Sequence, residues 1–230
     1  MKFYDVFNGD ADGLCALLQL RLAHPRESIP VSGVKRDIRL LDRVEAQQGD
    51  EITVCDISLD ANRVALERVL QQGASVSWFD HHYPGEIPAR PGFIPHIDTD
   101  PGICSSLIVD RHLGGMFRHW AIVAAFGDNL DCTAWRLAAD AGLNDKETAL
   151  LRRLGVAINY NAYGETLEDL LYSPVDLLGQ MRSFSDPREF ARSGEVFSSL
   201  IDRMNDDIAR ARAIPVQSIA PGSAYALLPK

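Results

Sequence analysis

The chain has 230 residues, 46% of them hydrophobic and 24% charged, which is ordinary for a globular protein with a sizeable core. A formal net charge of −9 argues against a general surface for duplex nucleic acid, because such surfaces are normally basic. No run of 18 apolar residues occurs, so no membrane span is expected. The N-terminus lacks a signal-peptide layout and the four cysteines are far apart, so we expect a cytoplasmic protein with reduced thiols.

Strand-like and helix-like segments alternate in the first half of the chain. Apolar runs bounded by turn residues predict strands at residues 3–7, 31–34, 51–56 and 75–79. Apolar residues at helical spacing predict helices at residues 13–24, 37–47 and 61–72. Asp37 and Asp60 are the expected caps of the second and third helices, and Gly73 is expected to end the third. The alternation predicts an α/β fold with a parallel sheet and helices on both faces.

The pattern changes after a loop rich in proline and glycine at residues 84–95. A short strand is predicted at residues 94–97, and helices follow at residues 103–113, 118–127 and 133–141. From Asp145 onward the chain is helical in pieces, ending at residues 196–213, and a strand-like run lies at Ala224–Leu228. We expect an α/β core, a mainly helical extension, and a tail that can begin a further domain, at residues 1–132, 133–213 and 214–230.

Acidic and imidazole side chains follow several of the predicted strands. Asp10 and Asp12 lie in an N-G-D-A-D-G stretch after the first strand, Asp56 ends the third, and Asp80-His81-His82 ends the fourth. The carboxyl ends of parallel strands share one edge of a sheet, so these groups should lie together. Such groups are costly to bury unless they are ligated or paired, which indicates a cluster of divalent metal ions.

Each of these motifs also has an ordinary structural explanation. Asp10 and Asp12 could form a turn with Asn8 and Gly9, and Asp56 could cap the turn that follows it. His81 and His82 could be loop histidines. Together, however, these explanations place five carboxylate or imidazole groups at one sheet edge by coincidence, so we favour the metal site.

Four segments resemble, in the same order, the motifs of the DHH phosphoesterase superfamily. They are N-G-D-A-D-G, C-D-I-S at residues 55–58, D-H-H at residues 80–82 and F-G-D-N at residues 126–129. The resemblance covers residues 2–131 and implies a hydrolase of phosphoester bonds that uses Mn²⁺ or Mg²⁺, with two ions in the site. The superfamily includes RecJ-type single-strand exonucleases, oligoribonucleases, cyclic-dinucleotide phosphodiesterases, exopolyphosphatases and family II pyrophosphatases.

The resemblance also implies roles for individual residues. The implied metal ligands are Asp10, Asp12, Asp56, His81 and Asp128. Asp56 would bridge the two ions, Asp80 would orient an imidazole, and His82 would contact the phosphate or protonate the leaving oxygen.

One position departs from the superfamily pattern. Many members have a histidine just before the first carboxylate, and RecJ-like members have an acidic residue where this chain has Asn8. Asn8 can offer a neutral carbonyl oxygen, which is a weaker ligand than either. We therefore expect the ion held by Asp10 and Asp56 to be loosely bound.

Other polar residues are secondary candidates for substrate binding. Lys35 and Arg36, at the end of the second predicted strand, could hold a phosphate oxygen or form a solvated pair. Ser105 and Ser106 could bind a phosphate or cap a helix. The segment at residues 159–164 could stack a base, or form a turn with partly buried tyrosines.

The D-A-D-G wording favours a RecJ-like phosphodiesterase that acts on an oligonucleotide, single-stranded nucleic acid or a cyclic dinucleotide. No G-G-G-H run of a substrate-gripping second domain is present, so either that domain is absent from this chain or the substrate is small. The alternatives are a phosphoanhydride hydrolase and a catalytically weak scaffold, the latter supported only by Asn8. The expected partner is short nucleic acid or a small phosphate compound, with no membrane, and the sequence sets no oligomeric state.

Overall fold

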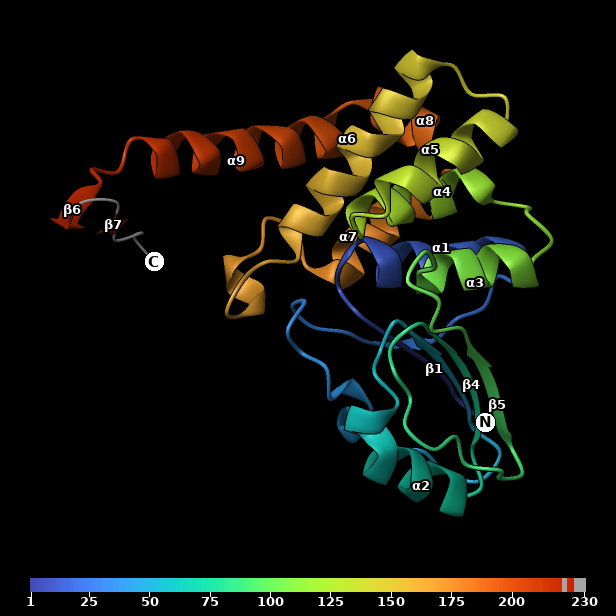
Figure 1. Ribbon diagram of the computed structural model, residues 1–230. Coiled ribbons are helices and arrows are strands. Elements are labelled where there is room, and N and C mark those ends of the chain that lie inside the picture. The colour runs from blue at the N-terminus through green and yellow to red at the C-terminus, as the bar shows by residue number, and fades with distance from the viewer. Residues whose placement is uncertain (221–222, 226–230) are drawn as a thin grey trace.

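The structure, a computed structural model, describes residues 1–220 and 223–225. Its first half is a five-stranded parallel sheet in the order β2-β1-β3-β4-β5. The strands are β1 (Phe3–Phe7), β2 (Ile29–Val31), β3 (Glu51–Cys55), β4 (Ser75–Asp80) and β5 (Phe93–Ile97). Helices lie on both faces of the sheet, with α1 and α3 above it and α2 below it in Figure 1. The predicted α/β class is therefore confirmed.

Alternate residues of the central strands feed two separate hydrophobic cores, as the period of a strand requires. Phe7, Cys55 and Phe79 pack towards α1 (Ala11–Ala23), α3 (Ser105–His112) and α4 (Arg118–Gly127). Val54 and Trp78 pack on the opposite face, towards α2 (Arg63–Gln71). Burial on both faces explains why these strands read as continuous apolar runs.

The predicted helix at residues 37–47 is wrong. Only a 3₁₀ turn forms there (Leu40–Arg43), and Ile38, expected to face inward, is 48% exposed. The backbone groups of this segment are bonded by side chains instead of by a helical ladder. The amide of Asn62 bonds Ile38 and Leu41, and the guanidinium of Arg68 donates to the carbonyls of Leu41 and Val44.

Smaller differences concern element ends. The second strand lies two residues earlier than residues 31–34, and Asp37 and Asp60 pair with Arg43 and Arg63 instead of capping helices. Gly73 follows α2 with φ of 85°, the left-handed conformation that glycine adopts without strain, as expected.

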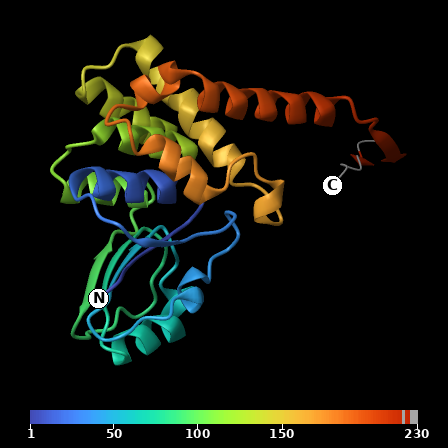
Figure 2. The same cartoon turned by 180° about the vertical axis from the view of Figure 1, so that it is seen from behind.

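The rest of the chain is mainly helical, as predicted. It contains α5 (Asp131–Asp140), α6 (Asp145–Asn161), α7 (Pro174–Met181), α8 (Pro187–Ser193) and α9 (Glu195–Arg212). Figures 1 and 2 both show α9 running away from the body of the molecule to a small antiparallel pair, β6 (Gln217–Ala220) and β7 (Ser223–Tyr225). The predicted run at Ala224–Leu228 thus begins in β7, and its last three residues lie outside the described residues.

Helix α4 is the centre of the helical part because it contacts α1, α3, α5 and α6. Glycines let it come very close to α6: a Cβ atom added at Gly155 would lie 2.1 Å from the carbonyl oxygen of Val123. One added at Gly127 would lie 2.4 Å from the Cβ atom of Ala11 in α1. This packing brings the end of α4, and Asp128 after it, to the start of α1. In the described part of the chain no helix is long and apolar enough to cross a membrane.

Candidate metal centre

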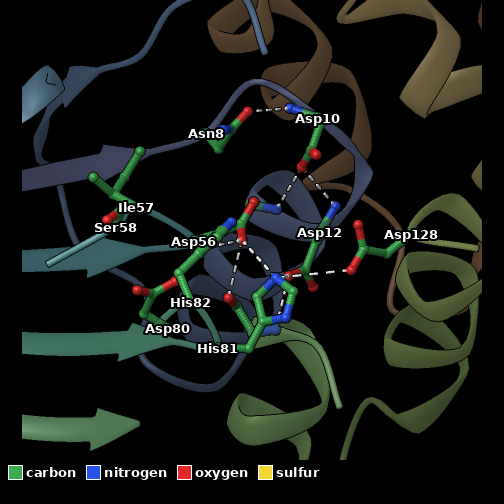
Figure 3. Close-up of polar contacts among 12 residues, drawn as sticks. Asn8, Asp10, Asp12, Asp56, Ile57, Ser58, Asp80, His81, His82 and Asp128 are labelled. Atoms are coloured by element: carbon green, nitrogen blue, oxygen red, sulfur yellow. Dashed lines mark hydrogen bonds and ion pairs between the residues drawn. The ribbon is translucent and has the colours of Figure 1, made fainter. Parts of the chain in front are cut away.

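The candidate site is an open cavity of ≈ 650 Å³ at the carboxyl edge of the sheet. It lies where β1, β3 and β4 end against the start of α1 and the end of α4 (Figure 3). Its lining residues come from segments remote in the sequence and are Asn8, Asp10, Lys35, Ile38, Asp56, Ser58, His81, His82 and Asp128. The shared edge of parallel strands thus brings the predicted polar groups together.

Carboxylate oxygens from three elements surround the Nε2 atom of His81 (Figure 3). The distances from that atom are 3.5 Å to Asp56, 3.8 Å to Asp128 and 3.9 Å to Asp12. One ligand atom each from Asp12, His81 and Asp128 lie within 4.8 Å of one another, and the same holds for Asp56, His81 and His82. Three carboxylates and an imidazole match the donors that Mn²⁺ accepts, so these residues fit one divalent ion.

Asp12 is held rigidly by the start of α3. Its two carboxylate oxygens accept hydrogen bonds from the backbone amides of Ser105 and Ser106, each at 2.7 Å. Gly13 lets this turn of α1 pack closely, since a Cβ atom there would lie 2.3 Å from the carbonyl oxygen of Asn8. The α3 N-terminus, which Cys104 does not cap through its side chain, is therefore capped by a carboxylate from 93 or 94 residues earlier.

Asp56 has a strained backbone at the end of β3. Its φ is 59°, a left-handed conformation that Asp and Asn adopt more readily than most residues, and Asn129 beside Asp128 has the same value. The hydroxyl of Ser105 donates to Asp56 Oδ1 at 3.1 Å. This geometry turns a fully enclosed carboxylate towards His81 (Figure 3).

The carboxylates of the site destabilise one another's ionised forms. Burial, followed by the charges of Asp10 and Asp12, raises the pKa of Asp56 well above its usual value. Burial and the charges of Asp12 and Asp10 raise the pKa of Asp128 from 3.8 to about 6. A divalent cation would relieve this repulsion.

Asp80 and His82 form a pair beside this cluster. The Nδ1 atom of His82 lies 2.7 Å from Asp80 Oδ1, and this hydrogen bond, more than any other interaction, raises the pKa of His82. Asp80 is fully buried, whereas the His82 side chain is 47% exposed. The bond to Nδ1 leaves Nε2 as the ring nitrogen available to a substrate.

Asp10 and Asn8 are engaged in contacts of their own. Asp10 Oδ1 caps α1 by accepting from the amides of Asp12 and Gly13, and Oδ2 accepts from Lys35 Nζ at 2.6 Å. Asn8 Oδ1 accepts from the amide of Asp10 at 3.2 Å, and its side-chain nitrogen donates to the carbonyl of Lys35. Asn8 thus shapes the turn before α1.

The secondary candidates separate into two groups. Lys35 lines the cavity and Arg36 is exposed beside it, whereas Ser105 and Ser106 are fully buried and offer no open phosphate site. The hydroxyl of Ser106 accepts from Gln19, a contact to which no sequence motif pointed. The serines therefore do not bind phosphate as suggested; they support Asp12 and Asp56.

The segment at residues 159–164 reaches the rim of the cavity. Asn159 Oδ1 accepts from Lys35 Nζ at 3.0 Å, and the ring of Tyr163 lies 5.6 Å from the same nitrogen. Tyr163 is 60% exposed, while Tyr160 donates to Asp207 of α9. The contact between Asn159 and Lys35 could not be read from the sequence because it joins residues 124 positions apart.

Comparison with solved structures gives the fold of this chain a precedent. A structure of exonuclease RecJ bound to manganese matches with a TM-score of 0.58 and 18% identity, covering 92% of this chain and 64% of that one. RecJ from Thermus thermophilus, in complex with Mn²⁺, matches at 0.40 and 17%, covering 82% and 35%. An uncharacterized protein from Helicobacter pylori G27 matches at 0.40 and 14%, covering 87% and 67%.

No protein-family model and no curated protein matches the sequence. The chain has the fold of exonuclease RecJ and spans less than two thirds of that structure's length. The expected resemblance to the DHH superfamily is thereby confirmed at the level of the fold.

Proposed function

We propose that this protein is a metal-dependent phosphoesterase that hydrolyses phosphodiester bonds in short single-stranded nucleic acid or a small nucleotide. The observation that carries the proposal is the convergence of Asp12, Asp56 and Asp128 on one nitrogen of His81. The likeness of the fold to RecJ bound to manganese supports the same chemistry.

In this proposal Asp12, Asp56, His81 and Asp128 hold a Mn²⁺ or Mg²⁺ ion. A divalent ion there lowers the pKa of water and neutralises charge that develops on a phosphoryl group. The second ion expected from the sequence, bridged by Asp56, would also need Asp10. That ion would have to displace Lys35 from Asp10 Oδ2.

His82 is the proposed proton donor to the leaving oxygen. Its hydrogen bond to Asp80 orients the ring and raises its pKa, so more of the imidazolium form is present near neutral pH. Half of its side chain is open to the cavity side of the molecule, which makes it reachable by a substrate. Lys35, in the same cavity, supplies positive charge for a phosphate oxygen.

The test is product analysis with Mn²⁺ on a short oligonucleotide, a cyclic dinucleotide and polyphosphate. We expect cleavage of at least one of the two nucleotide substrates. We expect Asp56→Asn, which preserves the backbone preference of this position, to lower kcat/KM by about 10³-fold or more, equivalent to several kcal/mol of barrier. Asp131→Asn is the matched control, because Asp131 is an exposed partner of Arg152.

The alternatives predict different results. Turnover of polyphosphate alone would favour the phosphoanhydride hydrolase. Absence of calorimetric Mn²⁺ binding would favour the scaffold, and full activity of Asp56→Asn would refute its role as a ligand.

A further inference from the structure

Lys35 places a fixed positive charge inside the candidate metal centre. Its Nζ atom donates to Asp10 Oδ2 at 2.6 Å and to Asn159 Oδ1 at 3.0 Å. The ring of Tyr163 lies 5.6 Å from the same atom, a distance at which an aromatic face attracts a cation. Acceptors from the start of α1 and from α6 therefore hold this ammonium group from two sides.

The neighbourhood of Asp10 does not fit a second divalent ion. Both oxygens of Asp10 already accept hydrogen bonds, one set from the start of α1 and the other from Lys35. The side-chain carbonyl oxygen of Asn8, the weak ligand expected there, accepts from the backbone amide of Asp10. Neither group of potential metal ligands that the described residues form includes Asp10 or Asn8.

The charges around Lys35 explain why a lysine can replace an ion at this place. Burial by itself would lower the pKa of Lys35, but the adjacent Asp10 carboxylate outweighs that effect and raises it. The ammonium group thus remains charged while it offsets Asp10, and the charge of Asp128 acts in the same direction.

We propose that the ammonium group of Lys35 takes the place of a second divalent cation, so that the centre works with one metal ion and one lysine. This inference rests on the proposed function and deepens it. Lys35 shares its cavity with His82 and Asp128, so a phosphoryl group bound between them has the lysine on one side and the metal ligands on the other. Lys35 then contacts a non-bridging phosphate oxygen, and Asn159 is its positioning residue.

The test is titration of the full chain with MnCl₂, followed by calorimetry and by electron paramagnetic resonance. The wild type is expected to bind one Mn²⁺ with the spectrum of an isolated ion. Lys35→Met frees Asp10 as a ligand, so a second Mn²⁺ should bind at least about tenfold more tightly than in the wild type and couple magnetically to the first. Lys35→Arg keeps the charge and should still bind one ion.

Lys146→Met is the matched control, because Lys146 is exposed in the first turn of α6, remote in sequence from Asn159 at the other end of that helix. It should bind one ion. Two coupled Mn²⁺ ions in the wild type, or one ion in a folded Lys35→Met, would overturn the lysine assignment and leave the proposed function standing. No Mn²⁺ binding by the wild type would overturn both. If Lys35→Met does not fold, the stoichiometry of the wild type and of Lys35→Arg decides.

Discussion

Ser105 orients two of the proposed metal ligands without being a proposed ligand itself. Its hydroxyl donates to Asp56, and its backbone amide donates to Asp12. The residue is fully buried, so no water can take over these bonds from the surface. Loss of the hydroxyl should leave the backbone contact with Asp12 intact and release only Asp56.

We therefore expect Ser105→Ala to weaken Mn²⁺ binding by about tenfold, in the range typical of residues that orient metal ligands. Ser106→Ala is the control, because Ser106 contacts Asp12 through its amide and its hydroxyl faces Gln19. Calorimetric titration of both variants decides the matter. Equal affinities would show that the bond from Ser105 to Asp56 has no influence on the ion.

At this scale the sequence predicts which residues gather and misses how they bond. Asp10, Asp12, Asp56 and His81 could be placed at one edge because parallel strands end there, whatever their side chains do next. The contact between Lys35 and Asn159 depends on how α6 docks onto the sheet, and no local pattern encodes that. Asn8 could be identified as an unusual residue, but its bonds to Asp10 and Lys35 required the backbone path of the turn.

Among the elements, the contact between α4 and α6 sets the position of Asp128. Gly155 of α6 packs against the carbonyl of Val123 in α4, and Asp128 directly follows α4. A side chain at residue 155 would force the two helices apart, because the atom it meets belongs to the backbone and cannot rotate away. The displaced end of α4 would carry Asp128 away from His81.

Gly155→Ala is expected to lower the free energy of unfolding by about 1–3 kcal/mol through overpacking, and to weaken Mn²⁺ binding. The control is Gly179→Ala in α7, where an added Cβ atom has open space. That variant should be stabilised by up to about 1 kcal/mol, since alanine is the better helix former. Urea denaturation measures both. A neutral Gly155→Ala would mean that the helices can separate without cost.

The accuracy of the element predictions follows the source of each element's hydrogen bonds. The helix at residues 118–127 was predicted with its observed bounds because an apolar, self-bonded helix is encoded locally. The segment at residues 37–47 failed because Asn62 and Arg68 bond its backbone, and these residues come later in the chain. Local periodicity cannot anticipate acceptors and donors that arrive from another element.

For the molecule as a whole, the crowded carboxylates link stability to pH. The folded state raises the pKa of Asp128 from 3.8 to about 6, so it binds a proton more tightly than the unfolded chain does. This contribution therefore favours folding at low pH and is lost as the pH rises from about 4 to about 6. A bound cation would remove the effect by stabilising the ionised form.

In metal-free protein, the free energy of unfolding of the wild type minus that of Asp128→Asn should fall across this pH window, by about 1–3 kcal/mol. The difference isolates Asp128 from acids elsewhere in the chain whose pKa is lowered, such as Asp186 beside Arg188. Urea titrations with a chelator from pH 4 to pH 7.5 measure it. A difference that is constant with pH would contradict the repulsion inferred for the site.

The bonds from Asp12 to α3 have a practical consequence for trapping a substrate on the enzyme. Removing this carboxylate would leave two buried amides without acceptors, at a cost of about 1–3 kcal/mol each, and would loosen α1 from α3. An inert variant intended for crystals with an intact oligonucleotide is therefore better made at Asp128, which lies at the rim and holds no helix start in place.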